Sequence, residues 1–283
     1  MLRSLNSGVS GLQQFQGSLD VIGNNIANSN TIAYKTARTD FAEAFSQTLR
    51  APSAGTTGGS GTMGMQIGSG VTTAAVRNQF TSGALTNTGV QTDLAIAGNG
   101  FFIVRDPVSG VEYATRAGDF RRDEGGYLVT NTGYRVRGFS DSGLATRGDL
   151  QMDGTGRPST SDPAATVVGY NIDAQGKITM RLSDGTGFVR GQVLLQSVRD
   201  PQALLKEGDN LYSGLAAAGA LPQTEAPGTN GLGDIRSGAL ELSNVDLANE
   251  FANLITAQRG FQASARIVTT SDEVLQEIVN LKR

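Results

Sequence analysis

The stretch Ser243–Arg283 reads SNVDLANEFANLITAQRGFQASARIVTTSDEVLQEIVNLKR and indicates one long amphipathic helix. Its apolar residues recur at alternating intervals of four and three, the spacing of a helix face that packs on another helix. Because the stretch contains no proline, the pattern predicts a helix of roughly 38 residues, about 57 Å long. The predicted contact residues are Leu247, Phe251, Leu254, Phe261, Val268, Leu275 and Val279.

The N-terminal stretch 1–30 carries a matching helical pattern in which leucines recur every seven residues. Its predicted contact residues are Leu5, Val9, Leu12, Leu19, Ile22 and Ile26. Gly8, Gly11, Gly17 and Gly23 each weaken a helix by about 1 kcal/mol relative to alanine, so this helix needs a partner. We therefore expect the segment 1–30 to pair with the segment 236–283 as a coiled coil.

The C-terminal helix has a second apolar stripe, which calls for a second partner. The stripe consists of Ile255, Ile267, Val274, Ile278 and Leu281. A neighbouring subunit of the same kind would supply that partner. The alternative is an ordinary pair of core helices in a monomer.

The region between the helices differs in composition. Residues 31–85 are predicted to be an extended linker with a glycine-rich insertion, since seven of the twenty residues from Ala51 to Gly70 are glycine. From 86 to 235, short apolar runs alternate with turns such as 106–110 and 123–126, which is typical of antiparallel β structure. The predicted fold is α+β: terminal helices, discontinuous in sequence, and a central antiparallel β-rich domain.

Composition excludes several functions. The 283 residues include no histidine and no cysteine, so thiolate and imidazole metal sites, disulfides and Ser–His–Asp or Cys–His catalysis are excluded. We expect no cofactor, no metal and no enzymatic activity. A formal net charge of −3 argues against a general nucleic-acid binder. The sequence has neither a membrane-spanning apolar run nor a signal-peptide pattern at its start.

Several polar clusters are candidates for sites, each with a simpler interpretation. The turns Asp153–Gly156 and Asp184–Gly187 lack the spacing of calcium or phosphate loops and are interpreted as tight turns. The carboxylates of Asp119, Asp123 and Glu124 could support glycoside hydrolysis, but they lie in turn sequences. A basic cluster is interpreted as a solvated or subunit-facing sheet surface; it comprises Arg116, Arg121, Arg122, Arg135 and Arg137.

Three blocks of the sequence together resemble one family. They are the N-terminal blocks Ser10–Leu12, Asp20–Asn28 and Asn30–Lys35, the blocks Asp93–Phe102 and Tyr113–Phe120 of the β region, and the C-terminal block Leu242–Gln262. They are similar to the bacterial flagellar axial proteins, which build the rod and the hook. The signature residues carried over are Asn24, Asn25, Ala27, Asn28, Tyr34, Lys35, Asn244, Asp246, Gln258 and Arg259. Position 33 departs from the family, because alanine stands where glycine is usual.

The resemblance implies a polymerising structural protein. Within the family the chain is most similar to a short hook protein, with the distal rod protein as the alternative. A secreted carbohydrate-binding or hydrolytic β domain is a more remote alternative. The implied partners are further copies of the chain, the distal rod and hook–filament junction proteins, the hook cap and the flagellar export apparatus. The implied location is the hook and basal body, outside the cell, reached without a cleaved signal peptide.

Overall fold

The computed structural model describes residues 2–55, 60–159, 161–162, 164–219 and 224–281. The chain divides into two compact units. The helical unit comprises Met1–Ser29, Thr36–Gln79 and Val245–Arg283, and the β unit comprises Asn30–Lys35 and Phe80–Asn244. The predicted α+β fold, with terminal helices and a central antiparallel β region, is confirmed. None of the described helices is long and apolar enough to cross a membrane.

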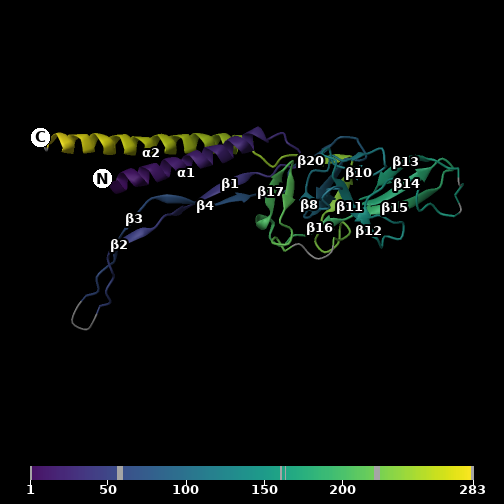
Figure 1. Cartoon of the computed structure of the whole chain (residues 1–283), viewed down its shortest axis with the longest axis horizontal. Helices are drawn as coiled ribbons and strands as arrows, with labels where there is room; N and C mark the ends of the chain where they lie inside the picture. Colours follow the sequence, from purple (N-terminus) through teal and green to yellow (C-terminus); the bar gives the residue numbers. More distant parts are fainter. Residues whose placement is uncertain (1, 56–59, 160, 163, 220–223, 282–283) are drawn as a thin grey trace. The chain divides into compact units, whose positions relative to one another are not determined.

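Two helices from opposite ends of the chain lie side by side in the helical unit (Figure 1). Helix α1 spans Leu2–Ala27 and helix α2 spans Leu247–Leu281. Helix α2 starts where the Asp246 carboxylate accepts hydrogen bonds from the backbone N–H groups of Ala248 and Asn249, at 2.9 and 3.3 Å. The capping residue of α2 is therefore Asp246.

The segment 31–85, predicted to be an extended linker, contains paired strands. Strand β1 (Ala37–Glu43) pairs antiparallel with β4 (Val71–Asn78), and β2 (Ser46–Arg50) pairs with β3 (Met65–Gly68). These short strands are rich in polar residues and lack a clear apolar alternation, and each pair is separated in sequence by the glycine-rich stretch 51–64, so their pairing has no local signal in the sequence. Residues 56–59, within the predicted insertion, lie outside the described residues.

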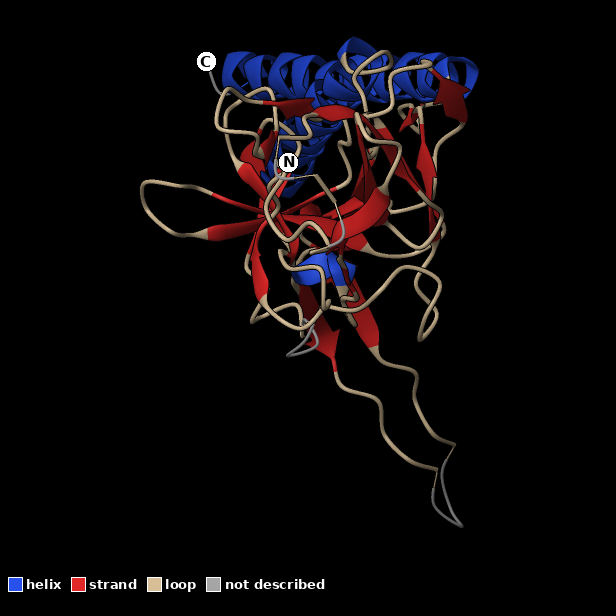
Figure 2. Ribbon diagram, turned by 90° about the vertical axis from the view of Figure 1, so that its right-hand side faces the viewer, coloured by secondary structure: helices blue, strands red, loops and turns tan. Residues whose placement is uncertain are grey.

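The β unit is built on one large antiparallel sheet, whose strands are red in Figure 2. The main path of the sheet runs β13-β14-β15-β11-β7-β8-β18-β17. These strands span Val167–Ile172 (β13), Lys177–Leu182 (β14), Gly187–Val193 (β15), Arg135–Phe139 (β11), Phe101–Arg105 (β7), Glu112–Thr115 (β8), Leu211–Ser213 (β18) and Leu205–Gly208 (β17). Shorter strands pair with inner strands of this path: Leu128–Val129 (β10) and Arg147–Asp149 (β12) pair with β11, Leu195–Gln196 (β16) pairs with β7, and Arg121–Arg122 (β9) pairs with β10. A short 3₁₀ helix, η1, spans Pro201–Ala203.

Two further strand pairs close the β unit with residues from near the end of the chain. Strand β6 (Leu94–Ala97) pairs with β19 (Asp234–Ser237), and β5 (Leu85–Asn87) pairs with β20 (Ala239–Glu241). Strand structure thus continues to Glu241, beyond the boundary at 235 that the sequence predicts.

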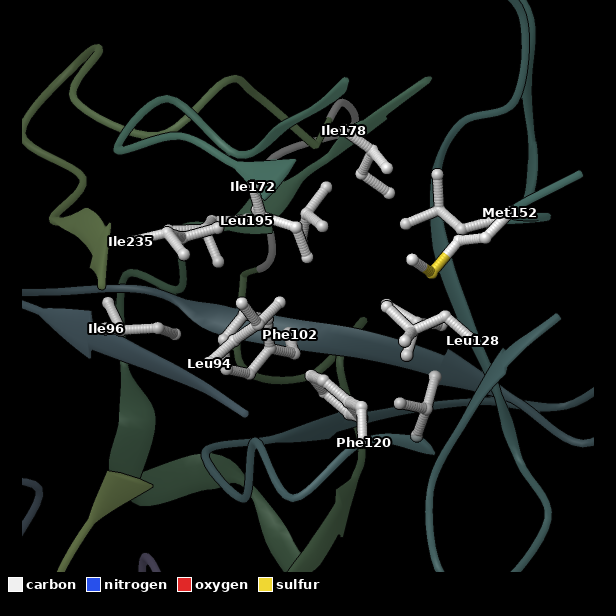
Figure 3. Packing of buried hydrophobic residues seen from close by; sticks show 14 of the residues in the cluster. Leu94, Ile96, Phe102, Phe120, Leu128, Met152, Ile172, Ile178, Leu195 and Ile235 are labelled. Atoms are coloured by element: carbon white, nitrogen blue, oxygen red, sulfur yellow. The ribbon is translucent and has the colours of Figure 1, made fainter. Parts of the chain in front are cut away.

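The core of the β unit is apolar and packs on one face of the main sheet (Figure 3). Phe102 and Phe120 meet edge to face at 5.2 Å between ring centroids, and Leu94, Leu128 and Met152 are fully buried beside them. A smaller cluster on the other face includes Phe101, Ile103 and Tyr212. Burial of this apolar surface is the main stabilising contribution to the unit.

A substitution at Gly118 provides a test of how tightly the β unit is packed. A Cβ added at Gly118 would overlap the carbonyl oxygen of Leu94, which is backbone and cannot rotate away. We expect Gly118→Ala to lower the free energy of unfolding by about 3 kcal/mol. Urea unfolding followed by circular dichroism measures the change. Gly169→Ala is the matched control, because its added Cβ meets nothing within 4 Å. Equal unfolding midpoints for the two variants would contradict the packing argument.

Candidate functional site

The contact between α1 and α2 is made mainly by small side chains. Gly8 and Gly11 of α1 are buried, and a Cβ at either position would press on Ser264 or Val268 of α2. The Ser4 and Ser271 hydroxyls lie 3.4 Å apart, and a Cβ at Gly260 would press on the Phe15 ring. Because Ser4 lies opposite Ser271 and Phe15 opposite Gly260, the two helices run antiparallel. Glycine and serine allow the backbones to approach closely.

The predicted contact residues of α1 lie partly at this contact. Ile22 is buried, Leu5, Leu12, Leu19 and Ile26 are half-buried, and Val9 is exposed. The residues that face α2 most closely are instead on the neighbouring stripe that includes Gly8 and Gly11. The sequence pattern identifies these glycines only as helix-weakening residues.

The predicted contact residues of α2 fall into two groups. Leu254, Val268 and Leu275 are half-buried, whereas Leu247, Phe251, Phe261 and Val279 are exposed. The buried positions of α2 are Ala257, Ser264 and Ser271, which repeat every seven residues. Alanine is only weakly hydrophobic and serine is polar, so these positions do not stand out in a pattern of apolar residues.

Most of the apolar surface of α2 is therefore left uncovered by the described part of the chain. Its exposed members, here called the α2 apolar surface, are Leu247, Phe251, Ile255, Phe261, Ile267, Val274, Ile278, Val279 and Leu281. Phe251 is 51% exposed and Val279 is 67% exposed. An exposed apolar surface of this length is typical of a protein–protein contact.

Asn25 connects three elements of the helical unit. It is buried, its amide donates to the Ala37 carbonyl at 2.8 Å, and it accepts from the Ala37 N–H at 3.0 Å. Its amide also lies 3.3 Å from a Glu250 carboxylate oxygen on α2. Asn25 therefore fixes the end of α1 against the start of β1 and the first turn of α2.

The other signature asparagines bond locally. The Asn28 side-chain amide donates to the Asn24 backbone carbonyl at 2.9 Å and to the Asn24 side-chain oxygen at 3.0 Å. These bonds close the last turn of α1. In the β unit the Asn244 amide donates to Thr81 Oγ1 at 2.8 Å. Ala27, Gln258 and Arg259 are exposed, and Arg259 lies 3.3 Å from Gln262.

Lys35 lies at the centre of a fully buried ion-pair cluster in the β unit. Its Nζ donates to Glu241 Oε1 at 2.7 Å and to the Thr81 carbonyl at 2.8 Å. The second carboxylate oxygen of Glu241 faces Arg116 Nη1 at 3.5 Å, and the Gly83 N–H donates to Oε1 at 2.8 Å. Burial lowers the pKa of Lys35, and Glu241 opposes that shift. The cluster joins residues 206 positions apart in the sequence.

This cluster includes two residues that the sequence pattern does not assign to a site. Glu241 is not among the sequence candidates, although its position inside the apolar run 239–242 is the signal that marks a buried charge. The prediction that Arg116 belongs to a solvated or subunit-facing basic surface is wrong, because its side chain is only 3% exposed and lies 5.3 Å from the Phe101 ring centroid. Arg121 and Arg122 of that group are exposed.

Tyr34 and Ala33 adjoin the cluster. The buried Tyr34 ring lies 4.2 Å from Lys206 Nζ, a cation–π distance. The buried Ala33 has φ of +56° and donates its N–H to the Glu241 carbonyl at 2.8 Å. Alanine thus occupies a left-handed conformation that favours glycine, so the departure from the family pattern places strain here.

The carboxylates considered as catalytic or metal-binding candidates accept hydrogen bonds from groups in their own turns. Asp153 accepts from the Thr155 N–H at 3.2 Å within its turn and from Arg190 Nε at 2.6 Å outside it, and Asp184 accepts from the Thr186 N–H at 2.8 Å. Asp123 accepts from the Tyr127 N–H at 2.7 Å. Burial raises the pKa of Asp119, beside Asp93. Across the described residues there is no group of three or more acidic side chains able to hold a metal ion.

Three family models match the chain along most of its length. "Flagella basal body rod protein" matches residues 5–35, "Flagellar hook protein FlgE/F/G D1 domain" matches 95–180, and "Flagellar basal body rod FlgEFG protein C-terminal" matches 236–281.

Relatives match over the full chain. The flagellar basal-body rod protein FlgG of Bacillus subtilis is 42% identical over 283 residues, which is all of both chains. FlgG of Agrobacterium fabrum is 34% identical over 96% of this chain and 97% of its own. The flagellar hook protein FlgE of Borreliella burgdorferi is 28% identical over an alignment of 444 positions that covers all of both chains.

The buried cluster predicts a specific stability effect. Lys35→Met leaves the Glu241 carboxylate buried without its main cation, so we expect the free energy of unfolding to fall by about 3–5 kcal/mol. The triple variant Lys35→Met/Arg116→Met/Glu241→Gln removes all three buried charges while keeping an acceptor for the Gly83 N–H, and should recover at least half of the loss. Urea unfolding measures both. A loss below about 1 kcal/mol in the single variant would refute the assignment.

Proposed function

The chain belongs to the flagellar rod and hook protein family, and from this premise we propose that it is a structural subunit of the distal rod of the flagellar basal body. Members of the family are structural components of the flagellum, so the chain is a flagellar protein. The resemblance of the sequence motifs favours the hook first and the distal rod second. The relatives support the opposite order.

Length and identity favour the rod. The B. subtilis rod relative aligns over 283 positions, the length of this chain. Alignment with the hook relative takes 444 positions, so that protein carries segments with no counterpart here. The identity to the rod relative is also higher, at 42% against 28%.

The α2 apolar surface is the observation that supports self-assembly. Its apolar side chains are left without a cover by the described part of the chain, although α1 packs along the same helix. Burying each such side chain against another copy contributes about 1.5–3 kcal/mol. Repetition of the same contact by every subunit builds a helical tube when the interface joins different surfaces of two copies.

The partners follow from this proposal. Each subunit contacts further copies of itself within the rod, and the last copies meet the hook proteins. Delivery through the flagellar export apparatus, without a cleaved signal peptide, is part of the proposal. We propose no enzymatic role.

The assembly surface can be tested by placing charges on it. The double variant Phe251→Asp/Ile255→Asp adds two carboxylates at exposed positions, so the monomer should fold normally. We expect the critical concentration for polymer formation to rise more than about tenfold, because two apolar contacts are lost. Sedimentation and electron microscopy of the purified chain measure it. Asn253→Asp, at an exposed polar position of the same helix, is the control and should polymerise normally. Unchanged assembly of the double variant would count against the surface.

Rod and hook can be separated in the bacterium that encodes the chain. If the chain is a distal rod subunit, deleting its gene leaves basal bodies with a truncated rod and no hook. If it is the hook subunit, deletion leaves a complete rod without a hook. Electron microscopy of purified basal bodies, with rod length as the readout, distinguishes the two. Restoration by a plasmid copy is the control. Full-length rods in the deletion strain would overturn the proposal.

A further inference from the structure

One face of the large sheet gathers arginines from neighbouring strands. Cross-strand register places Arg105 of β7 opposite Arg135 of β11 and opposite Glu112 of β8. In the same way Arg137 of β11 lies opposite Asp149 of β12. Residues paired in this way lie on the same face of a sheet, so three guanidinium groups meet there.

In the part of the chain that the structure describes, the three arginines have only two carboxylates near them, Asp149 and Glu112, so their charges are not fully neutralised. Asp149, whose side chain is 12% exposed, lies 3.7 Å from Arg105, 3.3 Å from Arg135 and 3.4 Å from Arg137. Glu112 adds one further contact, to Arg137 Nε at 3.0 Å. The Nε of Arg105 is buried and has no hydrogen-bond partner among the described residues.

A small cavity of about 110 Å³ adjoins this group. Arg137, Glu112, Arg147 and the buried Gln196 contribute to its lining. Arg147 donates to the Thr224 carbonyl at 2.9 Å and, within the described part of the chain, forms no ion pair. Arg137 and Arg147 line the cavity together with Glu112, whereas Arg105 and Arg135 do not line it and share Asp149 with Arg137. The group as a whole has four guanidinium groups and two carboxylates, which leaves an excess of two positive charges.

We propose that this arginine cluster, defined as Arg105, Arg135, Arg137 and Arg147, binds a carboxylate side chain from a second copy of the chain. The inference rests on the proposed self-assembly. Charge complementarity favours a second copy as the occupant. Without the four arginines, Glu112 and Asp149, 24 of the 26 Asp and Glu remain against 19 of the 23 Lys and Arg, so the rest of the chain carries a net negative charge. A contact between unlike surfaces of two copies is the kind that builds an open helical assembly. Its charges also fix the orientation of the incoming subunit.

Arg147 is the best position for a test, because its replacement leaves the three contacts of Asp149 intact. We expect Arg147→Glu to raise the critical concentration for polymerisation by about tenfold or more, Arg147→Gln by less, and Arg147→Lys only slightly. Added salt should weaken assembly of the unaltered chain more than that of Arg147→Gln. Arg181→Glu makes the same charge change at an exposed position of β14 and is the matched control. Circular dichroism of each monomer verifies its fold.

A second readout uses the absence of native cysteine. A single cysteine introduced by Thr224→Cys, beside the cluster, should react with a maleimide in the monomer and be protected in the polymer. The Val108→Cys variant, altered in an exposed turn, should react in the monomer and serves as the labelling control.

Two results would overturn the role of the cluster while leaving the proposed function intact. One is polymerisation of Arg147→Glu at the concentration at which Arg181→Glu polymerises. The other is equal maleimide labelling of the Thr224→Cys variant in monomer and polymer. Failure of the unaltered chain to polymerise would instead overturn the proposed function itself.

Discussion

The buried pair of Lys35 and Glu241 is the interaction on which the β unit most depends. A charge taken out of water is costly unless it is paired and hydrogen-bonded, and here each partner has both kinds of support. The pair holds a segment that follows α1 against a strand that precedes α2. Arg116 and the strained Ala33 backbone converge on the same glutamate. Neutral side chains could fill the space that Lys35 and Glu241 occupy, but either charge alone would be unstable there. The segment that follows α1 and the strand that precedes α2 must therefore pack against each other for either to be buried.

The helical unit follows a different principle. Its two helices approach most closely through glycine and serine, and much of the apolar surface of α2 stays exposed. The large side chains remain on the outside of α2, where they are available to other copies. On α2, the small residues therefore face α1 within the same chain, and the large residues remain free to contact another copy. This division explains how a monomer can fold without exhausting the surface that assembly requires.

The sequence is sufficient to predict both helices, because proline-free stretches with regular apolar spacing leave few other choices. It is also sufficient for the antiparallel β region, since turns recur between short apolar runs. The face of α1 that meets α2 could not be predicted, because Gly8 and Gly11 carry no hydrophobic signal. The strands β1–β4 could not be predicted, because they are short, rich in polar residues and lack a clear apolar alternation. Arg116 is misassigned because local sequence cannot show that a distant glutamate, Glu241, lies beside it.

The pairing of β5 with β20 and of β6 with β19 has a consequence for the order of events in folding. A chain synthesised from its N-terminus contains Lys35, β5 and β6 long before the residues that pair with them. Until Glu241 exists, Lys35 lacks its buried counter-ion, and two strands present open edges. Contacts separated by 206 residues form late, because the intervening chain must be ordered first. Closure of the β unit therefore requires synthesis at least as far as Glu241, and a chain terminated before that residue leaves the unit open.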